Sequence, residues 1–418
     1  WSSPDRPRLM EQPATTDAAP EQPRQLSRHQ LTVLILALMA TGIGQSLVFA
    51  ILAPLGREVG LREVQITSVI AVSALVFALA SPHWGRLSDR VGRRPVMITG
   101  LVGYTVGTLI FTSVFYLGLH GVLAGTTLYL VALLARCGQS VVMSATNPSA
   151  TAYAADNTSR GERTRTMAKL GTANSMGMIL GPAVSGALAT FGLLAPLYFA
   201  AMLAACAAVL VWRQLPPTPE DQLTPRSQLR RLRFTDPRLR LFIVSAVGLF
   251  IGFSGIQQTL GFQLQDKLSL SGIATAQMTG AALMVSASFT FLVQVTVMQR
   301  LKLDPGNFVR IGLVSLLCGA AFIAGFNQFS TLAVGMAFLG TGLGLCMPAI
   351  SAGASLAVSA EEQGGAAGLI AACPALGFTV GPVAAGALYQ IAPPLAPLFS
   401  AAVFFIVLVN LVLATRRQ

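Results

Sequence analysis

The chain has 418 residues, of which 53% are hydrophobic and only 11% are charged. Soluble domains carry about 25% charged residues, so this composition excludes an ordinary soluble globule. The chain has five cysteines, an odd and sparse count that excludes a secreted scaffold held together by disulfides. The net charge of +12 has two possible explanations, which are nucleic-acid binding and the excess of basic residues on the cytoplasmic side of a membrane protein.

The first segment, residues 1–28, is rich in proline, glutamine and charged residues. Such a composition cannot bury enough apolar surface to fold, and we predict a disordered tail. The tail lacks the apolar core of a signal peptide. Met10 is a candidate natural start, in which case residues 1–9 would be an addition to the natural chain.

Long apolar runs occupy most of the remaining chain. A helix that crosses a bilayer needs about 20 predominantly apolar residues. Runs of this kind cover 31–55, 65–84, 95–118, 123–147, 166–190, 193–213, 241–265, 273–298, 308–327, 330–356, 364–390 and 394–414. We therefore predict an all-α membrane protein with twelve transmembrane helices.

The basic residues predict the orientation of these helices. If the N-terminus is cytoplasmic, 24 of the 28 lysines and arginines fall on the cytoplasmic side. Arg57, Arg62 and Lys267 fall in outer loops, and Arg136 lies inside a span. Because Lys and Arg concentrate in cytoplasmic loops, we predict that both termini are cytoplasmic and that the chain lies in the inner membrane. This asymmetry explains the charge without nucleic acid.

A hydrophilic linker at 214–240, rich in proline and arginine, divides the spans into two blocks, 29–213 and 241–418. The sequence favours two readings of this linker equally. It can form a short amphipathic helix on anionic headgroups, or it can be a solvated basic loop.

The two blocks repeat one another at an offset of 200 residues. Pro148, which we expect to end the fourth span, recurs as Pro348, and Glu162 recurs as Glu362. The longest matching group consists of Gly177, Gly181, Pro182 and Gly186, which recur as Gly377, Gly381, Pro382 and Gly386. We infer two six-helix bundles in the same orientation, a parallel repeat typical of transporters with a site at the repeat interface.

We interpret the segment after the second span as a loop, and it carries a spaced motif with glycines at Gly85 and Gly92, an acid at Asp89 and arginines at Arg90, Arg93 and Arg94. This G-x-x-x-D-R-x-G-R-R pattern resembles the signature of the major facilitator superfamily. Arg136-Cys-Gly-Gln139 and the Gly177–Gly186 segment resemble weaker motifs of the same family. The resemblance covers about 29–415 and is closest to the twelve-helix drug:proton antiporters.

The resemblance implies two bundles that rock about a central cavity. It implies that Asp89 caps the helix that starts near Gly364, and that Arg93 pairs with Asp156. Both contacts are expected to hold the cytoplasmic side shut in the outward-facing state. The glycines and prolines of the repeat are expected to bend the helices and let them pack closely, with direct substrate contact as the alternative.

Within the spans, one ionisable residue stands out. Arg136 is the only charge deep in a span, and such residues are costly enough to be functional candidates. Where related exporters of cationic drugs often carry a carboxylate, this chain has Gln45. We therefore expect Arg136 to favour anionic or neutral substrates over cations. The alternative is a structural Arg136 satisfied by helix carbonyls and Gln139.

Buried amides and aromatic residues complete the predicted cavity. Buried amides need partners, so they either bridge helices or face a wet cavity. The amides expected to contribute to the substrate site are Gln45, Asn174, Gln257, Gln258 and Gln263, although Gln257 and Gln258 are adjacent and cannot both face it. Phe49 is expected to supply an apolar wall, or else to pack in the core.

The sequence contains no metal-ligand spacing, nucleotide-binding loop or nucleophile elbow, so we predict neither an enzyme nor a bound cofactor or metal. We predict a monomeric secondary transporter that exports a small organic molecule by proton-coupled alternating access. Two rivals remain: a dedicated exporter of a siderophore-like metabolite, and a proton-coupled importer. A rival from another class is a transporter-like membrane sensor that no longer transports.

Overall fold

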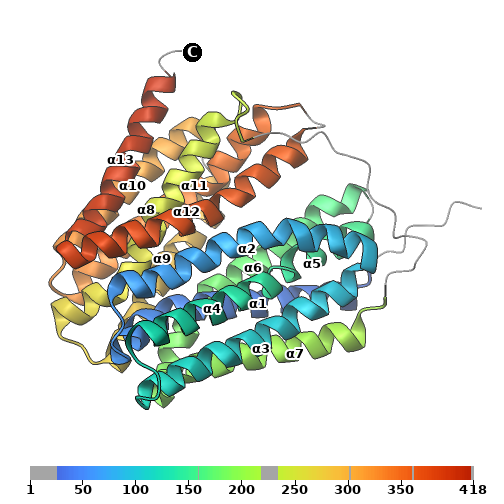
Figure 1. Ribbon diagram of the computed structural model, residues 1–418. Coiled ribbons are helices and arrows are strands. Elements are labelled where there is room, and N and C mark those ends of the chain that lie inside the picture. Colours follow the sequence, from blue (N-terminus) through green and yellow to red (C-terminus); the bar gives the residue numbers. More distant parts are fainter. Residues whose placement is uncertain (1–25, 159, 218–233, 301–302, 360–361, 416–418) are drawn as a thin grey trace, which may run out of the picture.

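The structure, a computed structural model, describes residues 26–158, 160–217, 234–300, 303–359 and 362–415, and these form a bundle of long helices (Figure 1). In chain order the elements are α1 (Arg28–Glu58), α2 (Glu63–Val91), α3 (Arg93–Leu119), α4 (Gly125–Met143), α5 (Thr146–Asp156), α6 (Arg160–Leu188), η1 (Ala189–Phe191), α7 (Ala195–Gln214), α8 (Arg240–Leu268), α9 (Gly272–Arg300), α10 (Pro305–Gly325), α11 (Phe329–Leu356), α12 (Gln363–Ile391) and α13 (Leu395–Thr415). Most of the predicted tail, and the central part of the predicted linker at 218–233, lie outside the described residues.

Within the described ranges, eleven helical segments are long and apolar enough to cross a membrane, with α4 and α5 counted as one segment. The twelfth, α6, is 29 residues long but less apolar, because its first turns carry Glu162, Arg165 and Lys169. All twelve predicted spans therefore correspond to helices, and the all-α, twelve-helix prediction is confirmed.

The helices extend beyond the apolar runs, and this corrects the reading of the Gly85–Arg94 motif as a loop. Helix α2 continues to Val91, so Gly85, Asp89 and Arg90 are helical. Only Gly92 makes the turn, with φ of 103° and ψ of 150°. A residue with a side chain rarely adopts this backbone conformation. Gly85 serves no turn; a Cβ added there would meet only Pro148 Cβ at 3.9 Å.

Pro148 was expected to end the fourth span, and this is also corrected. The break lies earlier, at Ser144 and Ala145, between α4 and α5. Pro148 sits in the first turn of α5, where a missing N–H costs nothing because the helix has no partner for it. The span therefore runs on to Asp156.

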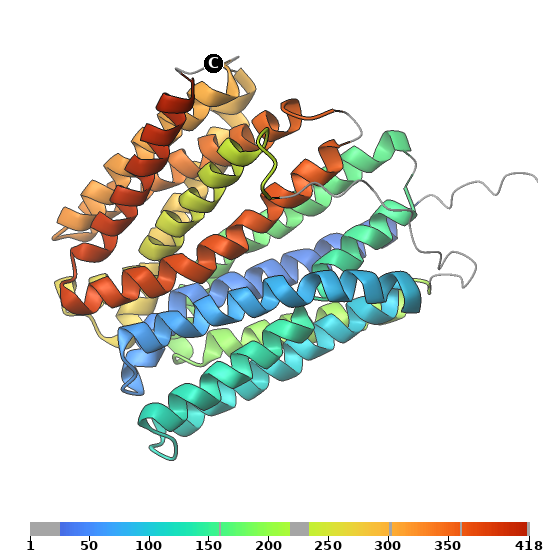
Figure 2. The same cartoon turned by 45° about the horizontal axis from the view of Figure 1, so that its top comes forward.

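The helices form two bundles, one of α1–α7 and one of α8–α13. Helix α1 packs against α6 and α7, and α8 packs in the same way against α12 and α13. Figures 1 and 2 show the two bundles converging where α1 and α8 end and diverging where α2 ends and α12 begins. We call these two sides of the molecule the Arg57 end and the Asp89 end.

The parallel repeat is visible in individual atoms. In the first bundle Ser46 Oγ of α1 donates to the Gly177 carbonyl of α6 at 3.4 Å. In the second bundle Ser254 Oγ of α8 donates to the Gly377 carbonyl of α12 at 3.1 Å. The repeated glycines therefore have the same role in both bundles, because they allow the backbones of two long helices to pack closely against each other.

The contacts between the bundles repeat as well. A Cβ on Gly186 of α6 would lie 3.2 Å from Gln277 Cα of α9. The second contact exchanges the roles of the bundles, because Gly386 of α12 in the second bundle packs closely on Thr67 of α2 in the first. Both contacts lie toward the Arg57 end, so the bundles are held together there while they separate toward the Asp89 end (Figure 2).

Candidate functional site

The described carboxylates share one feature, which is that each lies within four residues of a helix end. They are Glu58, Glu63, Asp89, Asp156, Glu162, Asp236, Asp266, Asp304 and Glu362, and Asp236 lies just outside a helix, in the turn before α8. The middle of the bundle thus holds no acid among these residues. An uncompensated positive charge in a low-dielectric interior attracts anions. The buried cation in the middle of the bundle therefore makes the electrostatic potential there positive.

That cation is Arg136 of α4, which is 6% exposed. Its Nη1 donates to Gln139 Oε1 at 2.6 Å, and Gln139 Nε2 donates in turn to Thr108 Oγ1 of α3 at 2.5 Å. The guanidinium also lies over the ring of Phe111, 5.6 Å from its centroid. Arg136 therefore faces α3, inside the first bundle, and the structure does not bring it into contact with the other predicted substrate residues.

Two donors in this region have no partner among the described residues, the Nε of Arg136 and the hydroxyl of Tyr104. Tyr104 is buried and packs on Gly44 of α1, which has no side chain to obstruct it. The hydrogen bond to Gln139 is what a structural role of Arg136 requires, and the unsatisfied Nε is what anion binding requires. Both readings of Arg136 remain open at this point.

Aromatic side chains from both bundles meet near the centre of the molecule. Phe49 of α1 stacks on Phe378 of α12, with ring centroids 5.5 Å apart and an interplanar angle of 17°. Phe250 and Phe253 of α8 lie 6.4 and 6.5 Å from the same Phe378 ring. All four rings are half-buried. Phe49 is thus placed at the junction of the bundles, as an apolar wall of a central site requires.

The predicted amides are dispersed along three helices. Gln257, Gln258 and Gln263 of α8 are buried, and each has a side-chain atom without a partner. Asn174 of α6 lies against Gly42 of α1, and its Oδ1 is likewise unpartnered. Gln45 is half-buried. Polar atoms left over in this way are the groups that a substrate in the interior would satisfy.

At the Asp89 end, Arg93 is the residue with which the acidic side chains form ion pairs. Its Nε donates to Asp156 Oδ2 at 3.0 Å and its Nη1 to Ser88 Oγ at 2.7 Å, and it also pairs with Asp89. The predicted pairing of Arg93 with Asp156 is present. Because both residues belong to the first bundle, however, this pair cannot itself clamp the two bundles together, which corrects part of the predicted gate.

The other gating residues also make their contacts within the first bundle. Asp89 is paired with Arg93 and not with the start of α12, because α2 and α12 have diverged at this end (Figure 2). Its expected contact near Gly364 belongs to the opposite conformational state and stays a prediction. Arg94 donates to the Trp212 carbonyl in the last turn of α7, and Arg90 lines an exposed pocket of about 240 Å³ with His83 and Arg86.

The helix-bending residues lie at helix crossings. Pro182 is inside α6 and Pro382 is inside α12, and both helices continue through them. The Pro182 carbonyl faces Gly280 of α9, where an added Cβ would overlap it. A proline leaves a carbonyl in the preceding turn without its usual partner, and this allows the helix to bend. Bending as the role of these residues remains a prediction.

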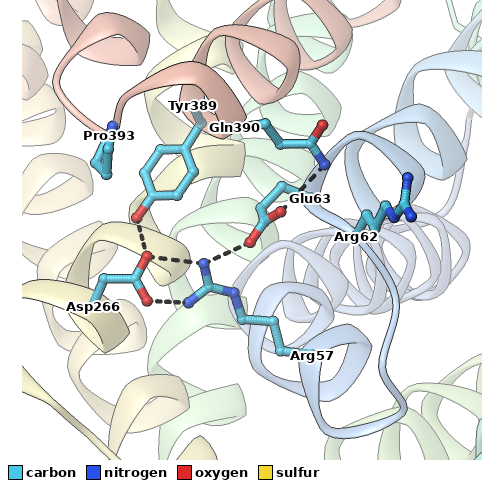
Figure 3. A pocket seen from close by; sticks show the side chains of 7 residues that line it. All are labelled: Arg57, Arg62, Glu63, Asp266, Tyr389, Gln390 and Pro393. Atoms are coloured by element: carbon cyan, nitrogen blue, oxygen red, sulfur yellow. Dashed lines mark hydrogen bonds and ion pairs between the residues drawn. The ribbon is translucent and has the colours of Figure 1, made fainter.

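A cluster at the Arg57 end was not predicted (Figure 3). Arg57 at the end of α1 forms a two-pronged ion pair with Asp266 at the end of α8, at 2.5 and 2.9 Å. The Nη2 of Arg57, one of the two prongs, also donates to Glu63 Oε1 at 2.7 Å. Tyr389 donates to Asp266 at 2.5 Å, and Gln390 donates to Glu63 at 3.3 Å. We call these five residues the Arg57 cluster.

The Arg57 cluster borders a cavity of about 490 Å³ that also contacts Arg62 and Pro393. The guanidinium of Arg57 lies 4.9 Å from the centroid of the Phe262 ring, on which Tyr389 packs. The sequence did carry a signal for this cluster. Basic residues are rare at this end, and a rare charge next to Glu63 and level with Asp266 invites pairing.

Comparison with known proteins shows the family. Residues 34–326 match the model of the Major Facilitator Superfamily. The chain belongs to the major facilitator superfamily. It is 25% identical over 372 residues to "Multidrug resistance protein 2" of Bacillus subtilis (strain 168), covering 86% of this chain and 88% of that protein. The match to the "Bacillibactin exporter" of the same organism is 23% identical and covers 81% and 85%.

Among solved structures, a bacterial homolog of the human lysosomal transporter Spinster in an inward-facing conformation superposes with a TM-score of 0.71 at 14% identity, over 92% of this chain and 96% of that one. The fold is therefore that of the superfamily. The chain is an integral membrane transporter and not an enzyme, as the motifs predicted, and it is similar to multidrug resistance proteins.

Proposed function

We propose that this transporter exports a small anionic or neutral organic molecule across the inner membrane, by alternating access coupled to protons. The observation that carries the proposal is the placement of charge. Arg136 is buried in the middle of the bundle, while every described carboxylate lies at a helix end. A cation has no counter-charge there, whereas an anion gains one.

The aromatic junction supports an organic substrate. Phe49, Phe250, Phe253 and Phe378 offer ring faces from both bundles, against which a planar apolar group can pack. Gln257 and Gln258, one turn beyond Phe253 along α8, each have an unpartnered amide atom, and whichever of the two faces the substrate supplies a hydrogen bond. Binding between the bundles would let the substrate influence their relative position, as alternating access requires.

Orientation and coupling follow from the same distribution of charges. We propose that the Asp89 end is cytoplasmic, because the basic residues concentrate there. The structure is then inward-facing, open toward the side from which an exporter loads. The coupling proton would be carried by a carboxylate at an end of the bundle or by the substrate itself, because arginine does not release its proton at physiological pH. We propose a monomer as the working unit.

The experiment compares an aromatic carboxylic acid with its methyl ester, as ligands of the purified wild-type protein and of Arg136→Gln. We expect the variant to weaken acid binding about tenfold or more and to change ester binding less than twofold, because a charged hydrogen bond contributes about 1.5–3 kcal/mol. Gln139→Leu is the matched control, since it breaks the Arg136–Gln139 bond and keeps the charge. Equal weakening of acid and ester would contradict the proposal and favour a structural Arg136.

A dedicated exporter of a siderophore-like metabolite is the second candidate. It is favoured by the similarity to the bacillibactin exporter and by the cationic interior, which suits a molecule rich in acidic oxygens. Competition by a catecholate or polycarboxylate in the same binding assay separates this narrow specificity from a broad one.

A further inference from the structure

The Arg57 cluster divides into contacts within a bundle and contacts between bundles. Arg57 with Glu63 lies within the first bundle, and Tyr389 with Asp266 lies within the second. The ion pair of Arg57 with Asp266 and the hydrogen bond of Gln390 with Glu63 cross from one bundle to the other. The crossing contacts are the ones that must break if the bundles separate at this end.

This division makes separation reversible. When the crossing contacts break, Arg57 retains Glu63 and Asp266 retains the Tyr389 hydroxyl, as Figure 3 lets the reader follow. No charge is then left without a partner, which would otherwise be the main obstacle to opening a partly buried ion pair. The side chains of Arg57 and Glu63 are 18% and 22% exposed and that of Asp266 is 41% exposed, so water can reach the cluster as it opens.

The packing around the cluster favours the closed arrangement. Arg57 lies over Phe262 of the second bundle, and Gly261 beside that ring packs on Ala53 of α1. The close contact of Gly386 with Thr67 lies one turn below Gln390. At the other end of the molecule, the ion pairs of Arg93 with Asp89 and with Asp156 lie within the first bundle. The Arg57 cluster, by contrast, contributes charged contacts that join the two bundles at their ends.

We propose that the Arg57 cluster is the lock that holds the transporter closed at the Arg57 end, and that its crossing ion pair sets the balance between the two alternating states. Closing forms the two-pronged Arg57–Asp266 pair, and opening exchanges it for the partners within each bundle. Weakening the pair shifts the population toward the state open at the Arg57 end. Because ligand affinity measured from the other side scales with the population that can bind, that apparent affinity falls by the same factor.

The test measures the separation of the bundles at this end in liposomes, without substrate. Spin labels are placed at Val122, 67% exposed between α3 and α4, and at Asn327, exposed between α10 and α11, in a background lacking the five native cysteines. Double electron–electron resonance then gives the fraction of molecules with the longer distance. We expect Arg57→Gln and Asp266→Asn each to raise that fraction at least threefold.

The controls distinguish the lock from general effects of charge. Arg62→Gln removes an arginine from the same cavity wall that forms no ion pair among the described residues, and it should leave the distances unchanged. The double variant should equal either single one, because both remove the same interaction. Asp266→Asn keeps the shape of the side chain, so it remains informative if Arg57→Gln folds poorly. Unchanged distances in Asp266→Asn, or an equal shift in Arg62→Gln, would overturn the proposal.

Discussion

The two bundles share their packing but not their charges. Ser46 with Gly177 in the first bundle has its counterpart in Ser254 with Gly377 in the second, and Gly186 and Gly386 each reach across to the opposite bundle. By contrast, the position 200 residues after Arg136 is Met336, which is fully buried. The motif around Asp89 and Arg93 likewise has only scattered basic residues as its counterpart at 299–310.

This difference indicates that the repeat preserves what the backbone needs. Close helix crossings require small residues at fixed spacing, and this requirement applies in each of the two bundles. Buried charge is needed only where it acts, and a second Arg136 would add another cost of insertion without a partner. The second bundle contributes instead Asp266, Tyr389 and Gln390, which act on Arg57 and Glu63 of the first.

The largest expected effect tests the shared packing. Gly181→Leu and Gly381→Leu should each reduce transport more than tenfold or prevent folding, because forcing side chains into a close-packed interior costs about 1–3 kcal/mol or more. A Cβ at Gly181 would already lie 2.7 Å from the Ile43 carbonyl, and one at Gly381 would overlap the Ile251 carbonyl. Transport rate per molecule and recovery of folded protein are the measurements.

The matched controls are Gly171→Leu in α6 and Gly368→Leu in α12, since an added Cβ meets nothing within 4 Å at either position. Both should express and transport almost as the wild-type protein does. If Gly181→Leu lost transport and Gly381→Leu did not, the two helix crossings would not be equivalent. The two bundles would then share their shape without sharing the need for close packing.

The fold was predictable because hydropathy and length suffice to find membrane helices. The ends of the helices were hardest to predict where charged residues continue a helix beyond the bilayer core. For this reason Gly85–Arg90 was wrongly predicted to be a loop. The direction of a side chain is a different matter. Arg136 was identified from its depth in a span, but its contact with α3 depends on how α4 is rotated, and no spacing in the sequence gives that rotation.

The Arg57 cluster shows a second limit. Arg57 and Asp266 are 209 residues apart, and they meet only because two bundles close at one end. The repeat relates equivalent helices to each other, whereas this contact joins a bundle to its partner. In our proposal such a pairing also exists in one conformational state and not in the other, so a single sequence pattern cannot specify it.

The second prediction concerns the turn at Gly92, between α2 and α3 of the first bundle. Gly92→Ala should lower the free energy of unfolding by about 1–3 kcal/mol, because a side chain strains the backbone at φ of 103°. Gly85→Ala, in the same motif, should be close to neutral, because the nearest atom to the added Cβ is 3.9 Å away. Thermal unfolding of both variants in detergent is the measurement. Equal losses would show that the glycines serve another purpose than the turn.

The third prediction addresses the charges that the second bundle lacks. Asp89→Asn and Arg93→Ala should slow transport by about tenfold, the effect of losing charged hydrogen bonds of about 1.5 kcal/mol. Ligand binding should stay within about twofold, because these residues lie at the Asp89 end, away from Phe49 and Arg136. Titration of ligand into the purified variants, next to transport in proteoliposomes, separates the two quantities. If binding falls as far as transport does, the motif acts on the cavity and not on a gate.

The smallest effect is expected at Arg238, whose charged contacts lie within the second bundle. Arg238 precedes α8 and donates to Glu362 at the start of α12 at 2.8 Å and to Asp236 at 3.0 Å. Hydrogen bonds from Arg238 hold the pKa of Asp236 below its usual value. The stability that Asp236 gains from them is present above the ordinary pKa of an aspartate and is lost as the pH falls through the lowered value.

Arg238→Gln should therefore lower the Tm at neutral pH by only about 1–2 °C, since Arg238 is half-exposed and surface ion pairs contribute little. The difference from the wild-type protein should shrink as the pH falls through the lowered pKa of Asp236, where this carboxyl becomes protonated. Arg240→Gln, two residues away and also at the start of α8, is the control and should show no such dependence on pH. A larger loss in Arg238→Gln that persisted in acid would mean that its side chain packs the start of α12, and that its charge is incidental.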